Sequence, residues 1–249
     1  MLNSAARSAR HRATLGALAV LLCAGAPACS SGSGEKAEPA PAVSTVGPTA
    51  RAGEAMATLA KLPAKLGADG TSLVVGKDSA PHTVKVMEDP RCPYCAKFET
   101  AAGPKLAELA ADGQIRIEYT IASFLDANLG GSGSANAARA LRASLDAGKF
   151  PEYHAALYAS QPKESVDGFT PAFLLAVADK VPGLRGAAFD KAVSSGAHAD
   201  WSARAEKAFE TSGARGTPTV LLDGKPVGPD DALYEAGAFT AALKERGIG

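Results

Sequence analysis

The sequence predicts an α/β fold in which a long helical segment interrupts a single sheet. A β-branched strand pattern covers 82–88, and a Cys-Pro-Tyr-Cys motif at 92–95 follows it at the start of an alanine-rich helical pattern. A second strand pattern, with apolar and polar residues in alternation, covers 115–121. The next strong strand pattern comes only at 218–222, and the residues before it have helical periodicity. Helices therefore separate two parts of the sheet.

Residues 1–29 have the composition of an export signal. The segment opens with three arginines and no acidic residue, and it continues at 13–28 as a small and apolar run. It ends Ala26-Pro-Ala-Cys29, which resembles the lipobox of bacterial lipoproteins with Cys29 as the lipidated N-terminus, although leucine usually stands where Ala26 is found. Cleavage after Ala28 by an ordinary signal peptidase, which leaves Cys29 free, is the alternative.

Residues 30–52 are a predicted flexible tether, because Ser, Gly, Pro and Ala without apolar periodicity bury too little surface to fold. The folded domain is expected at 53–249. Export places its cysteines where disulfide bonds form and persist. Removing the leader's three arginines from the 26 basic residues leaves 23 against 26 acidic ones, a net charge of −3. This balance is not the footprint of a nucleic-acid-binding protein.

The domain is predicted to begin with a short helix or two at 53–66, where Pro63 interrupts the helical spacing. A strand at the edge of the sheet is expected at 71–75, closed by a turn that contains Gly76. The strand at 82–88 follows and is expected to be central.

The two cysteines of the motif are predicted to differ in reactivity. Pro93 suits the first position of a helix, where its missing N–H removes a donor that has no intrahelical partner. Cys92 then occupies the N-cap, where free backbone N–H groups and the helix dipole stabilise its thiolate. The thiolate is the attacking species in thiol–disulfide exchange, so Cys92 is the candidate reactive and exposed sulfur. Cys95, one turn on and further in, is placed to resolve a mixed disulfide.

The same pair would also suit an inert disulfide or half of a zinc site. A second cysteine pair is not found in the domain, because Cys23 and Cys29 lie in the leader. A Cys2His2 site would have to recruit His154 and His198, whereas structural zinc takes four ligands at recurrent spacings. A strand, a CxxC motif and a helix in succession favour a redox-active dithiol without a metal.

The rest of the chain completes the sheet around the helical insertion. The helix after the motif should kink at Gly103-Pro104 and end at Asp112-Gly113. The insertion is expected at about 130–196, with one more helical pattern before the strand at the end of the chain. A short strand at 225–228 and a closing helix at 232–246 follow.

These motifs together resemble the DsbA-like family of thioredoxin-fold thiol–disulfide oxidoreductases, in particular the group found in bacterial lipoproteins and membrane-anchored thiol oxidoreductases. The likeness covers roughly Gly70 to the C-terminus. It is most specific at Asp89-Pro-Arg-Cys-Pro-Tyr-Cys95, Phe150-x-x-Tyr-His-x-x-Leu157 and Gly216-Thr-Pro-Thr219. It implies a thioredoxin fold with the helical insertion between the second and third core strands. It further implies no metal or organic cofactor, client proteins with cysteines, and a membrane partner that reoxidises the enzyme.

The resemblance also assigns roles to residues around the cysteines. In the family the proline of the last motif is cis and packs against the CxxC sulfurs, so Pro218 is expected to be cis and Thr217 to offer its backbone to a client strand. Many relatives carry a buried acid six residues before the first cysteine, where this chain has Val86. Glu88 lies on the same strand face by alternation and is the candidate proton relay in its place. The alternative for Glu88 is a solvated residue at the strand end.

The sequence thus predicts an extracytoplasmic thiol–disulfide oxidoreductase, anchored by lipid to the outer face of the bacterial cytoplasmic membrane or, alternatively, secreted. Disulfide formation in exported proteins is the expected direction. A reductase or isomerase is the alternative, because Tyr94 cannot stabilise the Cys92 thiolate by charge as a histidine there would. An alternative of another class is a binding lipoprotein in which Cys92 and Cys95 form a fixed staple.

Overall fold

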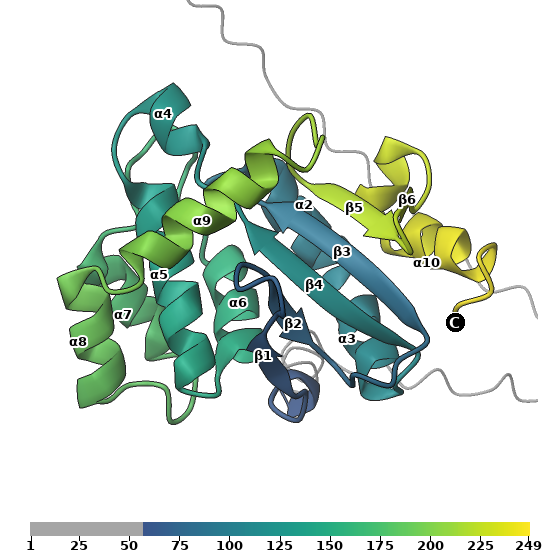
Figure 1. Cartoon of the computed structure of the whole chain (residues 1–249), viewed down its shortest axis with the longest axis horizontal. Helices are drawn as coiled ribbons and strands as arrows, with labels where there is room; N and C mark the ends of the chain where they lie inside the picture. Colours follow the sequence, from purple (N-terminus) through teal and green to yellow (C-terminus); the bar gives the residue numbers. More distant parts are fainter. Residues whose placement is uncertain (1–56) are drawn as a thin grey trace, which may run out of the picture. The chain divides into compact units, whose positions relative to one another are not determined.

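The computed structural model describes residues 57–249, so the leader, the tether and Cys29 lie outside the described residues. Within this part of the chain, six strands form one sheet in the order β1-β2-β4-β3-β5-β6 (Figure 1). The central pair, β3 and β4, is parallel, and the other neighbours are antiparallel. The strands are β1 (Ala64–Leu66), β2 (Leu73–Val75), β3 (His82–Glu88), β4 (Ile115–Ile121), β5 (Thr219–Leu222) and β6 (Lys225–Pro226).

The N-terminal edge of the sheet differs from the prediction. Backbone at 57–59 is helical, as expected, but Ala64–Leu66 is a strand that pairs with β2. The predicted edge strand is therefore internal, and all of Leu73–Val75 is buried. Because β1 is short and half-buried to exposed, it has no apolar alternation that a sequence pattern could reveal. Its pairing comes from β2 and from the Gly76 N–H, which donates to the Pro63 carbonyl at 2.9 Å.

The helix after the motif is broken as predicted. It forms α2 (Pro93–Ala101) and α3 (Gly103–Ala111), with Ala102 between them. Phe98 of α2 is fully buried and meets Phe239 edge to face at 5.9 Å between ring centroids. Phe239 belongs to α10 (Ala236–Lys244), which follows the short helix η1 (Asp230–Tyr234). The helices α2 and α3 lie behind the central strands in Figure 1.

A helical insertion separates β4 from β5, which are the second and third core strands, and this confirms the predicted thioredoxin fold. The helices extend from Leu125 to Glu210, beyond both ends of the expected segment. Phe209 of the last helix packs with Met87 of β3, so this helix covers the carboxyl ends of the central strands. The helices are α4 (Leu125–Leu129), α5 (Gly133–Asp146), α6 (Phe150–Ala159), α7 (Pro171–Ala178), α8 (Ala187–Ser195) and α9 (Ala199–Glu210).

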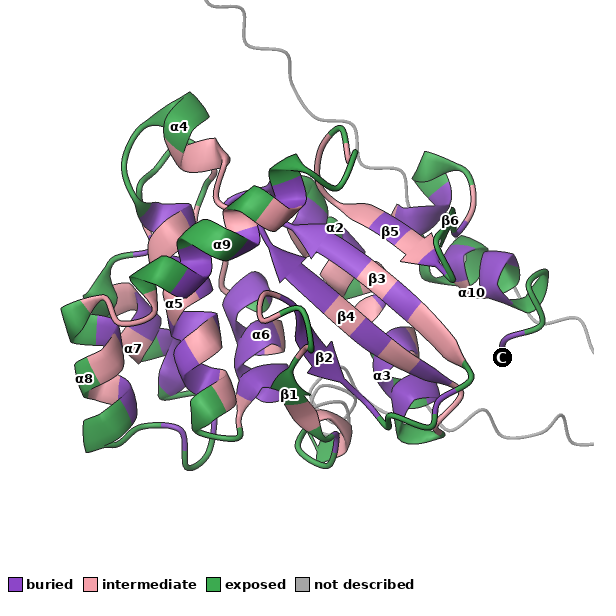
Figure 2. Ribbon diagram, viewed as in Figure 1, coloured by how far each residue is buried: buried purple, intermediate pink, exposed green. Residues whose placement is uncertain are grey.

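Burial along the central strands shows where the site lies. The first four residues of β3 and of β4 include both half-buried and buried positions, whereas the last three residues of each strand are all buried (Figure 2). Helices cover both faces of the sheet at that end, as in parallel sheets generally. Glu88, the last residue of β3, therefore lies in the protein interior, directly before the loop that carries the cysteine motif.

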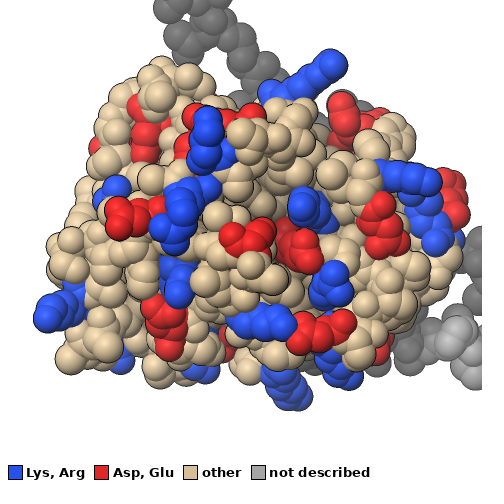
Figure 3. All heavy atoms as spheres, in the orientation of Figure 1, with Lys and Arg blue, Asp and Glu red and all other residues tan. Residues whose placement is uncertain are grey.

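The surface carries mixed charge. Figure 3 shows basic and acidic side chains interspersed over the face drawn, which agrees with a net charge near zero. Among residues 57–249, no helix combines the length and the apolar character that a membrane crossing requires.

Candidate active site

Cys92 lies at the N-cap of α2, as the sequence predicts. Its backbone is extended, with φ −70° and ψ 118°, and Pro93 takes the first helical position. The Cys92 thiol donates to the Thr217 carbonyl at 3.2 Å between sulfur and oxygen. Cys92 and Cys95 are both free thiols. The helix start and the loop before β5 thus meet at the first cysteine.

The expectation that Cys92 is exposed is wrong for the residue as a whole, which is only 7% exposed, while Cys95 is completely buried. Both cysteines pack against Tyr158 of α6, with Leu125 of α4 beside them. The insertion, whose helices the sequence does not place over the motif, provides this cover. A reacting thiol can therefore reach only a small part of the Cys92 surface.

The environment separates the pKa values of the two thiols. Hydrogen bonding from the Cys95 thiol, and then from Thr217 and the backbone N–H groups of Cys95 and Tyr94, outweighs burial and lowers the pKa of Cys92 to about 6. Burial, with the nearby Cys92 and Glu88 charges, raises the pKa of Cys95 well above its ordinary value. Cys92 is thus the thiolate near neutral pH, and Cys95 holds its proton.

The peptide bond between Thr217 and Pro218 is cis, as the resemblance implies. It directly precedes β5, which pairs antiparallel with β3. Since β3 leads into the cysteine motif, this pairing holds the Thr217 carbonyl beside Cys92. The structure therefore brings Cys92, Cys95, Thr217 and Pro218 into one site.

Asp89 fixes the loop that joins β3 to the motif. Its carboxylate accepts hydrogen bonds from the Arg91 N–H at 2.9 Å, the Ser134 hydroxyl at 2.6 Å and the Leu125 N–H at 3.1 Å. Burial raises the pKa of Asp89 to about 6, although these bonds favour its ionised form. Sequence reasoning did not assign Asp89 a role, because its partners lie in the insertion.

Arg91 joins the same loop to the insertion. Its side chain is buried and donates to the Asp126 carboxylate at 3.0 Å and to the Gly130 and Glu164 carbonyls at 2.7 and 3.0 Å. A buried guanidinium needs such partners, because an unpaired charge in the interior is costly. The Gln161 amide adds two bonds of 2.8 Å to the Pro90 and Cys92 carbonyls. The motif backbone is thereby held rigidly beneath the insertion.

Glu88 is completely buried, so the alternative of a solvated residue at the strand end is wrong. Its Oε1 lies 2.5 Å from Nε2 of His154, and Nδ1 of the same ring lies 3.8 Å from Oε2 of Glu99. The imidazole therefore stands between two carboxyl groups. Burial raises the pKa of Glu88 well above its ordinary value and that of Glu99 to about 8, and it lowers the pKa of His154.

Sequence reasoning missed Glu99 and Tyr158 and gave His154 no role in redox chemistry. Two spacings point to them. Glu99 lies four residues after Cys95, and Tyr158 lies four residues after His154, so each pair shares one helix face. The spacings do not show that the two faces meet, since this depends on the packing of α2 against α6.

Within residues 57–249, Glu88, Glu99 and His154 are the group whose ligand atoms lie close enough together to hold one metal ion. The Cys2His2 alternative is not assembled there, because His198 lies instead beside Asp146 at 3.2 Å. The 2.5 Å between Glu88 and His154 is a hydrogen-bond distance. Two ligands of one zinc ion, each about 2 Å from the metal in a tetrahedron, lie farther apart.

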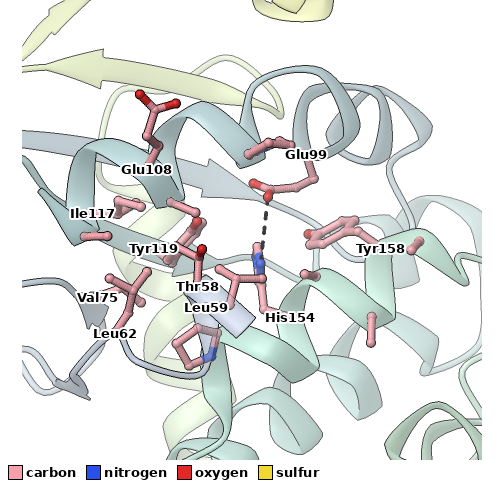
Figure 4. A pocket seen from close by; sticks show the side chains of 18 of the residues that line it. Thr58, Leu59, Leu62, Val75, Glu99, Glu108, Ile117, Tyr119, His154 and Tyr158 are labelled. Atoms are coloured by element: carbon pink, nitrogen blue, oxygen red, sulfur yellow. Dashed lines mark ion pairs between the residues drawn. The ribbon is translucent and has the colours of Figure 1, made fainter. Parts of the chain in front are cut away.

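A cavity of about 820 Å³ adjoins this cluster, between α3, α6 and the start of the described chain. Leu59, Leu62 and Val75 belong to its apolar lining, whereas Glu99 and His154 belong to its polar side. Figure 4 shows these two side chains facing each other, with a dashed line between them and Tyr158 to one side. The buried cluster thus borders a cavity, and neither Thr217 nor the two cysteines are among the described residues that line it.

Comparison with known proteins agrees with this geometry. The family model described as Thioredoxin matches residues 68–244. A curated relative, disulfide bond formation protein D of Bacillus subtilis (strain 168), is 26% identical over 157 residues, which cover 62% of this chain and 68% of the relative.

Two solved structures give the same picture. The reduced disulfide bond oxidoreductase DsbG of Mycobacterium tuberculosis is 25% identical, with a TM-score of 0.58 over 72% of this chain and 88% of that one. Oxidised BdbD of Bacillus subtilis is 20% identical, with a TM-score of 0.60 over 74% of this chain and 97% of that one, which shows a common fold.

Proposed function

Because the chain belongs to the thioredoxin family and, within it, to the DsbA-like thiol–disulfide oxidoreductases, we propose that it forms disulfide bonds in exported proteins. The observation that carries this proposal is the difference between the two thiols. Cys92 has a pKa of about 6 and Cys95 a pKa well above the usual range. Stabilising the thiolate of the reduced enzyme makes its disulfide a stronger oxidant.

The proposed reaction starts from the oxidised enzyme. A client thiolate attacks the Cys92 sulfur, the bond to Cys95 breaks, and Cys95 leaves as a thiolate that takes up a proton. A second client thiolate then attacks the client sulfur of the mixed disulfide and releases Cys92 as a thiolate. Two electrons pass from the client to the enzyme, and a membrane redox partner is proposed to remove them.

The source of the low Cys92 pKa bears on the direction of exchange. Tyr94 contributes a backbone N–H but no charge, as the sequence implies. The larger effects come from Cys95 and Thr217, which sequence reasoning did not weigh. They compensate for the absence of a histidine in the dipeptide, and they favour disulfide formation over the reductase or isomerase alternative. A permanent structural disulfide does not require its two cysteines to differ in pKa, so the binding lipoprotein is not favoured either.

We propose that clients bind along the Thr217 loop as an added strand. The Thr217 carbonyl accepts the Cys92 thiol hydrogen, and loss of that proton frees the carbonyl for a client N–H. Tyr94 is 52% exposed, with the Tyr234 ring 5.6 Å away and the Lys97 ammonium 4.8 Å above it. This exposed aromatic surface next to Cys92 suits the apolar side chains of an unfolded client.

The reduction potential of the Cys92/Cys95 couple tests the proposed direction. Equilibration of the purified domain with glutathione should give a potential well above the ~−270 mV typical of thioredoxin. The same protein should oxidise a reduced client peptide faster than glutathione disulfide alone does. A potential at or below that of thioredoxin would favour the reductase alternative.

Anchoring by Cys29 is a separate proposal that rests on the leader and the tether. Cys29→Ser should move the protein from the membrane fraction to the soluble exported fraction, because it removes the site of lipidation. Cell fractionation and mass spectrometry of the mature N-terminus measure this. A wild-type protein that is already soluble, with an unmodified Cys29 at its N-terminus, would support secretion instead.

A further inference from the structure

We propose that His154 and Glu99 carry the proton of Cys95 between Glu88 and the cavity beside α3 and α6. The inference rests on the proposed function, because it supplies a route for the proton that Cys95 gains or loses in thiol exchange. Cys95 is completely buried, and Cys92 is only 7% exposed. A proton on Cys95 therefore needs a path through the protein.

The first step of the path joins Cys95 to Glu88. Tyr158 connects their surroundings, because it packs against Cys95 and its ring also contacts His154, whose Nε2 lies 2.5 Å from Glu88 Oε1. Tyr158 also faces Glu88. Glu88 Oε2 and the Tyr158 hydroxyl are both buried without a hydrogen-bond partner. Since such groups are costly, their presence beside the resolving thiol indicates a role in the reaction.

The second step runs through the His154 ring. Its Nε2 lies 2.5 Å from Glu88 Oε1, and its Nδ1 faces Glu99. Tyr119, with ring centroids 4.5 Å apart, and Tyr158, at 5.0 Å, pack against the imidazole and fix its orientation. A neutral imidazole has one nitrogen that accepts and one that donates, so a ring held between two carboxyl groups can pass a proton from one to the other.

The third step delivers the proton to the cavity. Glu99 Oε2 lies 3.8 Å from Nδ1 of His154, longer than a hydrogen bond, so a small rotation of Glu99 or a bridging water completes the contact. Oε1 of Glu99 has no hydrogen-bond partner, and Glu99 lines the cavity (Figure 4). A cavity of about 820 Å³ with polar groups on its wall is large enough for several waters.

The protons balance in both directions. When Cys95 leaves as a thiolate, it takes a proton from Glu88, Glu88 takes one from Nε2 of His154, Nδ1 takes one from Glu99, and Glu99 takes one from water. When the Cys95 thiol attacks, the same transfers run backwards and one proton leaves through the cavity. No group in the path changes its oxidation state.

The charge states of the cluster suit this role. Burial raises the pKa of Glu99 to about 8 and raises the pKa of Glu88 well above its ordinary value, which favours the protonated form of both carboxyl groups. Burial lowers the pKa of His154, which keeps the ring neutral and able to both accept and donate. The titratable groups that face the path are Glu88 at the end of β3, Asp89 in the loop after it, Cys92, Cys95 and Glu99 at α2, Tyr119 of β4, and His154 and Tyr158 of α6.

A two-phase reaction of the reduced protein tests the path. An aromatic disulfide that releases a coloured thiolate reacts first with Cys92, and Cys95 then attacks the mixed disulfide and releases a second coloured thiolate. The first phase reports on Cys92, whereas the second needs Cys95 to lose its proton. Stopped-flow absorbance between roughly pH 6 and 9 gives the rates of both phases. In the wild type the rate of the second phase should increase with pH, as the cluster of Glu88, His154 and Glu99 loses a proton.

Glu99→Gln should slow the second phase at least ~10-fold near neutral pH and leave the first phase unchanged. Glutamine has the shape of the protonated carboxyl that Glu99 carries near neutral pH, so a purely structural role predicts no change in either phase. Glu99→Asp should restore part of the second rate. The matched control is Glu152→Gln on α6, a buried acid that pairs with Lys149 at 3.1 Å outside the path, and it should leave both phases unchanged.

A second phase in Glu99→Gln with the rate and pH profile of the wild type would overturn the relay. An unchanged first phase shows that the variant is folded, because the low pKa of Cys92 depends on the intact site. This outcome differs from a failure of the proposed function. A protein that reduces its clients would still show both phases and the Glu99 effect, but its reduction potential would be low.

Discussion

The two ends of one helical turn have opposite chemistry in this protein. Cys92 meets donors: the Cys95 thiol, the Thr217 hydroxyl and free backbone N–H groups, which lower its pKa to about 6. Cys95 meets apolar packing and acidic groups, which raise its pKa well above the ordinary value. The side chains are chemically identical, so the surroundings alone assign one as nucleophile and the other as resolving thiol. This difference is what the reaction needs, since the first thiol must leave easily and the second must hold its proton.

The largest expected effect comes from removing either thiol. Cys92→Ser should abolish disulfide exchange, because Cys95, the other thiol of the described domain, is completely buried and cannot form the mixed disulfide with a client. Cys95→Ser should instead accumulate mixed disulfides with clients, because their release by resolution is lost. Non-reducing electrophoresis of both variants, with alkylation of the reduced wild type near neutral pH, measures this. Equal and slow labelling of Cys92 and Cys95 in the wild type would contradict the assignment.

The sequence predicts the surroundings of Cys92 better than those of Cys95. The residues that determine the first are mostly neighbours in the sequence, whereas those that determine the second are distant. Pro93 and the N-cap position of Cys92 depend on neighbouring residues, so the sequence predicts them correctly. The alternation of side chains along β3 also predicts that Glu88 lies on the same face of the strand as Val86. The partner of Glu88 is His154, 66 positions away, and the tertiary packing of α6 brings it to the end of β3. Local patterns carry no information about such packing.

The same limit explains the other differences from the sequence-based prediction. β1 forms because β2 offers unpaired backbone groups, although its own residues have no strand pattern. The burial of Cys92 depends on Tyr158 and Leu125, both from the insertion. Periodicity and helix capping predict the thioredoxin core and the position of the cysteine motif. The packing of Tyr158 and Leu125 on the cysteines and the cluster of Glu88, Glu99 and His154 depend on contacts between distant segments, which local patterns do not predict.

A smaller effect separates the causes of the low Cys92 pKa. The Cys95 thiol is the largest of these causes, so Cys95→Ala should raise the pKa of Cys92 from about 6 toward the ordinary value of 9.0. The rate of Cys92 alkylation as a function of pH measures the change. Cys95→Ser retains a hydroxyl donor and should give a smaller rise, which makes it the matched control. If Cys95→Ala and the wild type titrate together, the helix start and Thr217 alone account for the acidity.

The smallest expected effect is on stability, and it has opposite signs at the two ends of the turn. The pKa of Cys92 falls from 9.0 to about 6 on folding, so its contribution to the free energy of unfolding is present above about pH 9 and is lost as the pH falls through 6. The pKa of Glu99 rises from 4.5 to about 8, so its contribution is present below pH 4.5 and is lost as the pH rises through 8.

These opposite dependences predict how two variants diverge from the reduced wild type. As the pH rises from about 4.5 to 8, the free energy of unfolding of Glu99→Gln should increase relative to that of the reduced wild type, by no more than ~1.4 kcal/mol per pH unit for one group. Above about pH 8 the difference between the two proteins should stay constant. Cys92→Ser should lose stability relative to it between about pH 6 and 9. Urea unfolding in the presence of a reductant at a series of pH values measures both differences. Parallel curves for Glu99→Gln and the wild type over that range would show that Glu99 is ionised in the folded protein, and would remove the proton reservoir that the relay requires.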